Sequence, residues 1–333
     1  MISRGYGQLA ASRPQCYLRR MRLLVTGASG LLGRALMRLL ADRPDIDTLG
    51  LAHSRAKAPL VRADIGDEPA IAAILSGFAP DVVLHAAAER RPDVVDREPE
   101  RAAALNVDAT LRLARLAAGR GAFFIYISTD YVFDGSNPPY FPDSPVHPLN
   151  AYGAMKLEGE RGAAARVAAA QAAGKTCSGL AIVRIPLLYG PVERLDECSV
   201  TEIAAKLAAR YTESLPCPIE DWATRYPAHV DDVARALIAV IDARSNAPES
   251  TGGIYQLSGP VGYSKYGMAL IMARALGMAP DFILPERAEP SGAPRPKDCR
   301  MDTRRLAALG WTARIGFPEG IAPVLSPHFA KFD

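Results

Sequence analysis

A glycine-rich turn near the start of the chain constrains its fold more than any other feature. The turn lies between the apolar run 22–26, which predicts a strand, and the stretch 31–41, which predicts a helix. In this setting, regularly spaced glycines permit a tight turn and let the backbone approach a pyrophosphate, which the helix N-terminus can bind. The turn therefore predicts the first unit of a dinucleotide-binding domain. The residues expected to contact the cofactor here are Gly27, Ser29, Gly30, Leu31, Leu32 and Gly33.

Strands and helices are expected to alternate along the following part of the chain. Short apolar runs predict strands, and longer stretches with helical spacing predict helices. Such alternation predicts right-handed βαβ units and an α/β fold, a doubly wound parallel sheet of the Rossmann type with helices on both faces. The expected strands are 47–52, 60–63, 81–85, 122–127 and 180–184, and the expected helices are 69–76, 97–118 and 152–173.

The regular pattern loosens after Gly190, which predicts a second, smaller unit. Residues 1–20 contain four arginines and no acidic residue, a weak likeness to an organellar transit peptide. A disordered extension, or an upstream start with Met21 as the working start, is the preferred interpretation. The expected division is an extension at 1–20, an NADP-binding Rossmann domain at 21–190 plus 227–257, and a C-terminal substrate lobe at 191–226 plus 258–333.

Composition excludes several classes of protein. The formal net charge is +3 over 333 residues and lies mostly in the extension, so the remainder is nearly neutral and does not predict a nucleic-acid-binding surface. The five cysteines are scattered without a C-x-x-C pair, which predicts reduced thiols in the cytoplasm and no metal site. No apolar run reaches the roughly 20 residues of a membrane helix.

The end of the second expected strand indicates which dinucleotide is bound. An acidic residue there would bind the ribose 2′-hydroxyl, whereas basic residues accommodate a 2′-phosphate. The segment 53–57 is basic and has no acidic neighbour, which predicts NADP(H), although a solvated basic loop would look the same. Asp64 either faces the adenine or caps the next helix. The further cofactor contacts expected are Ser54, Arg55, Lys57, Asp64, Ile65, Ala86, Ala87, Ala88, Asn106 and Ile185.

Tyr152 and Lys156 are the candidate catalytic pair. Residues four apart share one helix face, so the ammonium can lie near the phenol and lower its pKa. A tyrosine tuned in this way can exchange a proton with a carbonyl or alcohol oxygen. Thr129 ends the fifth expected strand, where ligands of such sheets bind, and can orient the carbonyl. Lys156 is also expected to bond the nicotinamide ribose.

Other polar residues have structural and functional interpretations. Asn106 can brace a water or the backbone near the site, or make an ordinary helix contact. His85 is interpreted as a satisfied core histidine, and Arg184 as a partner for a buried carboxylate or a substrate phosphate. Glu89, Arg90 and Arg91 border the expected substrate side, where two arginines would suit a diphosphate, and Arg295 is a similar candidate.

The chain resembles the extended short-chain dehydrogenase/reductases. In that family the Tyr and Lys of Y-x-x-x-K, with an upstream Ser or Thr, carry out the reduction. The segments 127–135 and 148–156 look like those of the group that contains dTDP-4-dehydrorhamnose reductase and the regulatory beta subunit of methionine adenosyltransferase. The likeness extends over about residues 21–320.

The resemblance implies two alternative functions. One is reduction of a 4-keto nucleotide-sugar by NADPH, with substrate contacts at Glu89, Arg90, Asp130, Leu187 and Arg295. The other is an NADP-binding regulatory subunit that docks on the catalytic subunit of methionine adenosyltransferase with little turnover. The segments 86–95, 184–190 and 221–230 look closer to the regulatory subunit, whereas the tail 325–333 departs from its docking tail. A homodimer is a further implied assembly.

Overall fold

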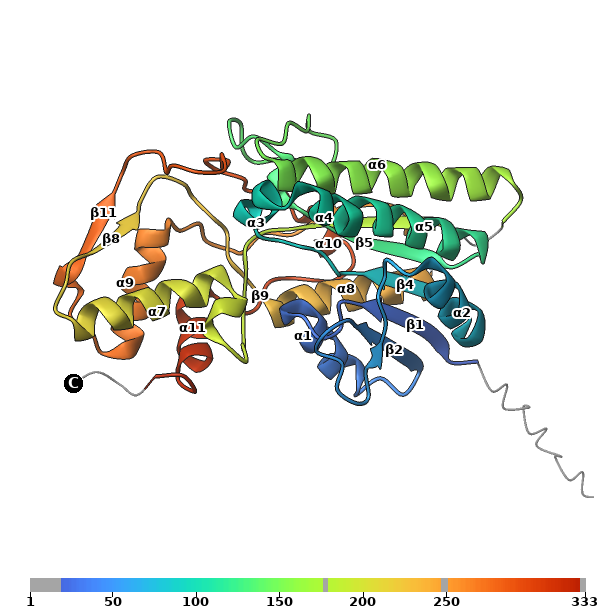
Figure 1. The fold of residues 1–333 in the computed structure, drawn as a ribbon, viewed down its shortest axis with the longest axis horizontal. Coiled ribbons are helices and arrows are strands. Elements are labelled where there is room, and N and C mark those ends of the chain that lie inside the picture. The colour runs from blue at the N-terminus through green and yellow to red at the C-terminus, as the bar shows by residue number, and fades with distance from the viewer. Residues whose placement is uncertain (1–18, 176–178, 247–250, 330–333) are drawn as a thin grey trace, which may run out of the picture.

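The computed structural model describes residues 19–175, 179–246 and 251–329, and its central feature is a seven-stranded parallel sheet (Figure 1). In the strand order β10-β6-β5-β4-β1-β2-β3, the chain builds the sheet outward from β1 first on one side and then on the other, as in a doubly wound Rossmann fold. The predicted fold class is therefore confirmed. The strands are β1 (Met21–Thr26), β2 (Ile46–Ala52), β3 (Val61–Arg62), β4 (Val82–His85), β5 (Phe123–Thr129), β6 (Gly179–Ile185) and β10 (Gly253–Gln256).

Helices cover both faces of this sheet, because alternate strand residues point to opposite sides. Leu23 and Val25 of β1 pack with α1 and α8, whereas Leu24 packs on the other side with α2 and α5. Two separate cores follow from this alternation. The helices of this unit are α1 (Leu31–Leu40), α2 (Glu68–Phe78), α3 (Pro92–Arg97), α4 (Pro99–Ala103), α5 (Ala109–Gly119), α6 (Ala151–Ala172) and α8 (Val230–Asn246).

The single helix predicted over 97–118 is found from Pro99 to Gly119, with a π-helical turn inside it. There α4 continues directly into the π turn η1 (Ala104–Asp108) and then into α5, and the short helix α3 precedes them. Glu98, with φ −128° and ψ 57°, interrupts the first turns. It precedes Pro99, and a residue before proline is disfavoured in the helical conformation. The π turn follows α4 and contains Asn106, whose side chain accepts a hydrogen bond from the Glu89 N–H.

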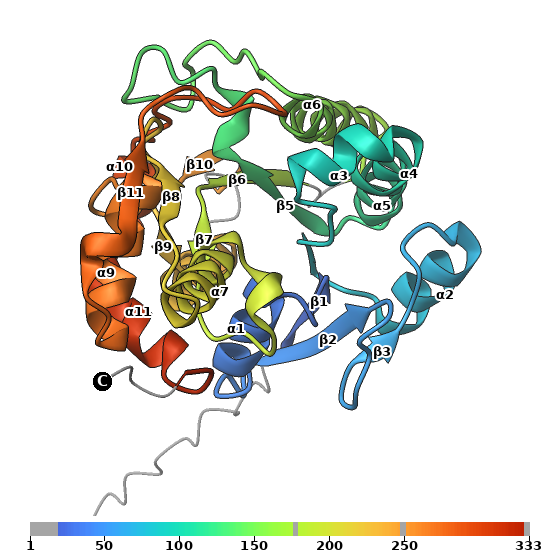
Figure 2. The same cartoon turned by 60° about the vertical axis from the view of Figure 1, so that its left-hand side comes forward.

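The rest of the chain forms a smaller C-terminal lobe with its own core. Buried residues of three helices, among them Leu207, Met268, Met272 and Ile321, pack together there. Figure 2 shows this lobe beside the carboxyl edge of the sheet. Its elements are β7 (Leu188–Tyr189), η3 (Leu195–Glu197), α7 (Ser199–Thr212), β8 (Cys217–Glu220), α9 (Lys265–Leu276), η4 (Pro280–Phe282), β11 (Ile283–Glu286) and α11 (Phe317–Leu325). The strand β9 (Ala228–His229) pairs with β7, and its Ala228 packs in the core of the nucleotide-binding unit.

The expected lobe boundary is wrong near the C-terminus. Leu306, in α10 (Arg304–Ala307), and Trp311 belong to the core of the nucleotide-binding unit rather than to the lobe. The Trp311 indole N–H donates to the Asp232 carbonyl of α8 at 2.8 Å. The segment at 304–311 thus crosses back to the sheet after leaving the lobe, a route that its local sequence does not indicate.

Some expectations concern residues that lie outside the described ranges. Most of the expected extension, residues 1–18, is among them, as are Cys16 and Cys177. Cys198, Cys217 and Cys299 are buried free thiols. Within 19–175, 179–246 and 251–329, no helix is both long and apolar enough to cross a bilayer.

Candidate functional site

The glycine turn between β1 and α1 has the geometry that its sequence predicts. Gly27 has a φ of +71°, and a Cβ on it would lie 2.8 Å from the Ala87 nitrogen. A Cβ on Gly33 would lie 2.2 Å from the Gly27 carbonyl oxygen. The N-cap residue of α1 is Gly30, which makes no side-chain cap, and the first turn holds no acidic residue. This donor set fits a pyrophosphate at the helix N-terminus.

The loop after β4 closes against this turn, which brings the expected residues Ala86, Ala87 and Ala88 beside it. Asn106 holds the loop: its Oδ1 accepts from the Glu89 N–H and its Nδ2 donates to the Glu89 carbonyl, both at 2.9 Å. This is the backbone brace foreseen for Asn106. These two bonds hold the loop after β4, and the expected contact of Asn106 with a cofactor stays a prediction.

His85 is buried below the loop and is satisfied on both ring nitrogens. Thr110 donates to the Asn106 carbonyl at 2.8 Å, so its Oγ1 accepts from His85 Nε2 at 2.9 Å. His85 Nδ1 then accepts from Thr26 Oγ1 at 2.7 Å. Burial, together with the charge of Lys156, lowers the His85 pKa to about 3. The interpretation as a neutral core histidine is confirmed.

The other expected cofactor contacts lie around the same edge of the sheet. Ser54 and Lys57 are exposed after β2, Ile65 is buried after β3, and Ile185 is half-buried at the end of β6. Asp64 is exposed and accepts from the Gly66 N–H at 2.8 Å, whereas Asp67 caps α2. The alternative role of Asp64 as a helix cap is therefore wrong, and its carboxylate remains on the surface of the site.

Arg55 has acidic neighbours that its local sequence does not reveal. Its guanidinium pairs with Glu197 and lies 3.6 Å from Glu193, two residues that precede α7. Glu197 also pairs with Arg34 of α1 at 2.7 Å. The expectation of a basic segment without an acidic neighbour is wrong in three dimensions, because the chain returns to this edge between β7 and α7.

Close packing of α6 on β5 places the candidate catalytic residues. A Cβ on Gly153 would lie 2.2 Å from the Tyr131 carbonyl oxygen, and one on Gly159 would lie 2.2 Å from the Tyr126 hydroxyl oxygen. Asn150 caps the helix by accepting from the Gly153 N–H at 2.9 Å. The first turn of α6, which carries Tyr152, is thereby fixed beside the end of β5.

The Thr129 side chain lies beside the Tyr152 phenol. Burial raises the pKa of Tyr152, and Thr129 opposes that rise. Thr129 Oγ1 also donates to Asp130 Oδ1 at 3.0 Å. Burial raises the pKa of Asp130 to about 7, so a carboxyl that titrates near neutrality is linked through Thr129 to the phenol.

Lys156 is buried and has a neighbour that the sequence did not indicate. Its Nζ lies 4.1 Å from the centroid of the Tyr126 ring, a cation–π contact. Burial lowers the Lys156 pKa to about 7, against the opposing charge of Glu160. The expected lowering of the Tyr152 pKa by Lys156 is wrong for this structure, because burial dominates that pKa and raises it.

Arg184 and Glu160 form a buried ion pair beneath the site. Arg184 Nη2 lies 2.7 Å from Glu160 Oε2, and its Nε donates to Oε1 at 3.0 Å. Ser128 donates to the same carboxylate. This confirms the interpretation of Arg184 as the partner of a buried carboxylate and assigns Ser128 to the same network.

The expected substrate residues are placed at the junction with the C-terminal lobe. Arg295 pairs with Asp93 of α3 at 2.9 Å, Glu89 pairs with Arg91, and Arg90 donates to the Glu197 carbonyl. Leu187 is half-buried against the lobe core, which limits the face that it can offer to a substrate.

Two cationic residues of the lobe were missed by the sequence reasoning. Arg225 pairs with Glu220 at 2.6 Å. The charges of Arg225 and Arg295 oppose the rise that burial causes in the pKa of Tyr131. The Tyr131 ring lies 6.0 Å from that of Tyr152. Burial and these two arginines lower the pKa of Lys265. Arg225 lies in the segment 221–230 that resembles the regulatory subunit but was not singled out there, and no motif surrounds Lys265. The packing of the lobe brings both residues to the site.

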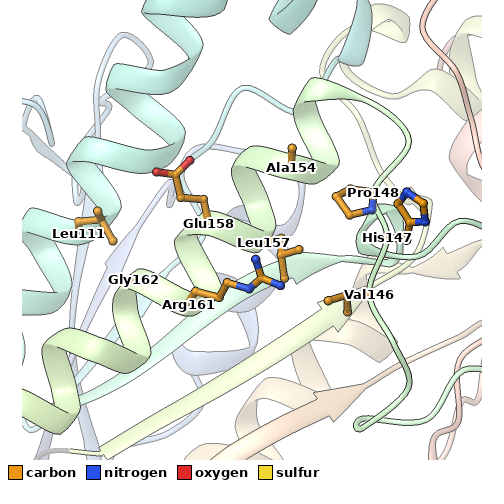
Figure 3. Close-up of a pocket in the computed structure, with 9 residues that line it drawn as sticks. All are labelled: Leu111, Val146, His147, Pro148, Ala154, Leu157, Glu158, Arg161 and Gly162. Atoms are coloured by element: carbon orange, nitrogen blue, oxygen red, sulfur yellow. The ribbon is translucent and has the colours of Figure 1, made fainter.

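A surface hollow of about 670 Å³ lies on a different side of α6 (Figure 3). Its lining includes Leu111 of α5, the loop residue Pro148, and Leu157, Glu158 and Arg161 of α6. It contains none of Thr129, Tyr152 and Lys156. We therefore place the candidate active site at the carboxyl edge of the sheet and not in this hollow.

Comparison with known proteins identifies relatives along most of the chain. The family model described as RmlD substrate binding domain matches residues 21–328. The methionine adenosyltransferase 2 subunit beta of Xenopus laevis is 40% identical over 307 residues, which cover 92% of this chain and 87% of that protein.

Solved structures are similar in fold. A dTDP-4-dehydrorhamnose reductase from Clostridium acetobutylicum has a TM-score of 0.75 at 25% identity, covering 92% of this chain and 99% of that one. A dTDP-4-dehydrorhamnose reductase from Bacillus anthracis in complex with NADP has a TM-score of 0.73 at 23% identity, covering 92% and 99% of the two chains.

Proposed function

We propose, since this chain belongs to the RmlD substrate binding domain family, that it is an NADP(H)-dependent reductase of a 4-keto sugar carried by a nucleotide. The observation that carries the proposal is the position of Thr129, the last residue of β5, beside Tyr152 in the first turn of α6 at the carboxyl edge of the sheet. A phenol held there can meet a carbonyl oxygen, and the glycine turn 27–33 fits the pyrophosphate of a dinucleotide.

The residues of this site account for the proton side of the reduction. Bound NADPH would supply the hydride to the carbonyl carbon. Tyr152 gives its phenolic proton to the carbonyl oxygen, so that the carbonyl becomes an alcohol, and Thr129 orients that oxygen by a hydrogen bond. The raised pKa of Tyr152 keeps the phenol protonated before the reaction. Lys156 would hold the nicotinamide ribose of the bound cofactor.

The charges at the lobe junction support an anionic substrate. Burial and the charges of Arg225 and Arg295 lower the pKa of Lys265, and these charges act in the same direction on the pKa of Tyr131. Guanidinium groups bind the oxygens of a diphosphate through paired hydrogen bonds. A nucleotide-sugar carries such a diphosphate next to its sugar, so its keto carbon would lie near Tyr152 when the diphosphate meets these cations.

The test is NADPH oxidation by the wild type and by Tyr152→Phe across a panel of 4-keto nucleotide-sugars. We expect turnover by the wild type and a loss of at least about a hundredfold in the variant, because a positioned acid contributes that much. The variant should still bind NADPH in a calorimetric titration, which separates lost chemistry from lost folding. An absence of substrate-dependent oxidation by the wild type would contradict the proposal.

A second function is favoured by a separate observation, the 40% identity to a methionine adenosyltransferase beta subunit over 92% of this chain. In that case the chain would hold NADP(H) and dock on a methionine adenosyltransferase catalytic subunit with negligible turnover. Affinity purification at native levels from the source organism distinguishes the two functions. Recovery of the synthetase together with an inactive Tyr152 site would favour this alternative, and its absence would contradict it.

A further inference from the structure

Glu197 receives arginine side chains from the nucleotide-binding unit although it precedes the lobe helix α7. Its carboxylate accepts from Arg34 at 2.7 and 3.3 Å and also from Arg55, and its side chain is only 10% exposed. Its backbone carbonyl accepts from Arg90. We call residues 191–198, which connect β7 to α7, the strap.

The three arginines locate the strap over the cofactor edge of the sheet. Arg34 lies in α1 after β1, Arg55 follows β2, and Arg90 follows β4. These strands are neighbours in the order β4-β1-β2. The carboxyl ends of parallel strands meet at one edge, where a dinucleotide binds. Figure 2 shows the segment before α7 reaching toward α1 at this edge.

The two guanidinium groups on the carboxylate differ in their freedom. Arg34 has further partners, because its Nη1 donates to the Ser29 carbonyl at 3.0 Å and its Nη2 to the Pro191 carbonyl at 3.4 Å. Its side chain is 25% exposed, whereas that of Arg55 is 44% exposed. The ion pairs of Arg55 are to Glu197 and Glu193. Arg55 can therefore turn to a new anion while Arg34 keeps the strap in place.

We propose that Glu197 occupies, on Arg55, the place of the cofactor's 2′-phosphate, and that NADP(H) must displace this contact to bind. The proposal rests on the proposed function, in which Arg55 meets the 2′-phosphate. A phosphate monoester is more highly charged than a carboxylate and offers three acceptor oxygens, so it can take the guanidinium from Glu197. The 2′-hydroxyl of NAD(H) cannot, and it leaves the Arg55–Glu197 pair intact.

Glu197 is therefore a specificity-determining residue that weakens the preference for a 2′-phosphate. Its removal should favour NADPH and leave NADH almost unchanged. Calorimetric titration of the full chain with NADPH and with NADH tests this in the wild type and in Glu197→Gln. Asp196→Asn is the matched control. It removes the same charge one residue away from Glu197, but the Asp196 carboxylate pairs with Arg194.

We expect Glu197→Gln to lower the Kd of NADPH by about tenfold, the change equivalent to one charge-assisted hydrogen bond. The Kd of NADH should stay within about twofold, and Asp196→Asn should change neither. Glu197→Asp, which shortens the side chain but keeps its charge, should lower the Kd of NADPH by a smaller factor. It serves as the second variant if Glu197→Gln does not fold.

Two results would overturn the inference while leaving the proposed function intact. One is an unchanged or weakened affinity for NADPH in both Glu197 variants, and the other is an equal change for NADPH and NADH. If the wild type binds neither dinucleotide, the proposed function itself fails, and the inference fails with it.

Discussion

Thr129, the last residue of β5, lies beside Tyr152 in the first turn of α6 and donates to the carboxylate of Asp130. One hydroxyl therefore joins the candidate acid to a carboxyl group whose pKa burial raises to about 7.

Replacing Thr129 by Val should impair the reaction more than binding. We expect kcat of NADPH-dependent reduction to fall by about a hundredfold, since the phenol loses the group that orients it. Thr129→Ser keeps a hydroxyl and should retain most of the activity. Steady-state kinetics of the three proteins check this, and a Val variant with the kcat and pH profile of the wild type would contradict it.

Lys156 should make the stability of the cofactor-free protein depend on pH. Burial lowers its pKa from 10.5 to about 7, so between these values the unfolded chain binds the proton and the folded chain does not. Stability therefore rises with pH across this window, by up to about 1.4 kcal/mol per pH unit for one proton. Urea unfolding at pH 7.5 and 9.5 measures the slope. Lys156→Met should remove it, and an equal slope in the variant would contradict the assignment.

Gly153→Ala should destabilise the protein, because the new Cβ would lie 2.2 Å from the Tyr131 carbonyl oxygen. Moving α6 away to relieve this contact costs about 1–3 kcal/mol, as overpacking does in other cores. Gly77→Ala in α2 is the control, since nothing lies within 4 Å of its Cβ, and it should stabilise by about 0.5–1 kcal/mol. Chemical denaturation measures both, and equal shifts in the two variants would refute the packing argument.

Replacing one partner of the Arg184–Glu160 pair should lower the free energy of unfolding. Both side chains are 4% exposed, so Arg184→Met leaves an unpaired buried carboxylate and should lose about 3–5 kcal/mol of the free energy of unfolding. Adding Glu160→Gln should recover part of that loss. A double-mutant cycle by urea denaturation gives the coupling, and additive losses would show that the pair does not act as a unit.

Much of the nucleotide-binding half was predictable from local patterns. The glycines of the turn, the short apolar strands and the capped start of α6 each depend on residues close in sequence. The helix expected over 97–118 is present from Pro99 to Gly119, and Pro99 is a visible signal for where it begins. The return of Leu306 and Trp311 to the sheet core had no comparable local signal.

The sequence by itself determined the parallel α/β fold, the glycine turn and the placement of Tyr152 and Lys156 on one helix. Backbone geometry and periodicity act over a few residues, so these features can be read locally. Only the tertiary structure decided that Lys156 faces the Tyr126 ring and that Glu197 pairs with Arg55, 142 positions away. Burial and ion pairing depend on which distant segments are in contact, and the packing of the lobe against the sheet determines those contacts.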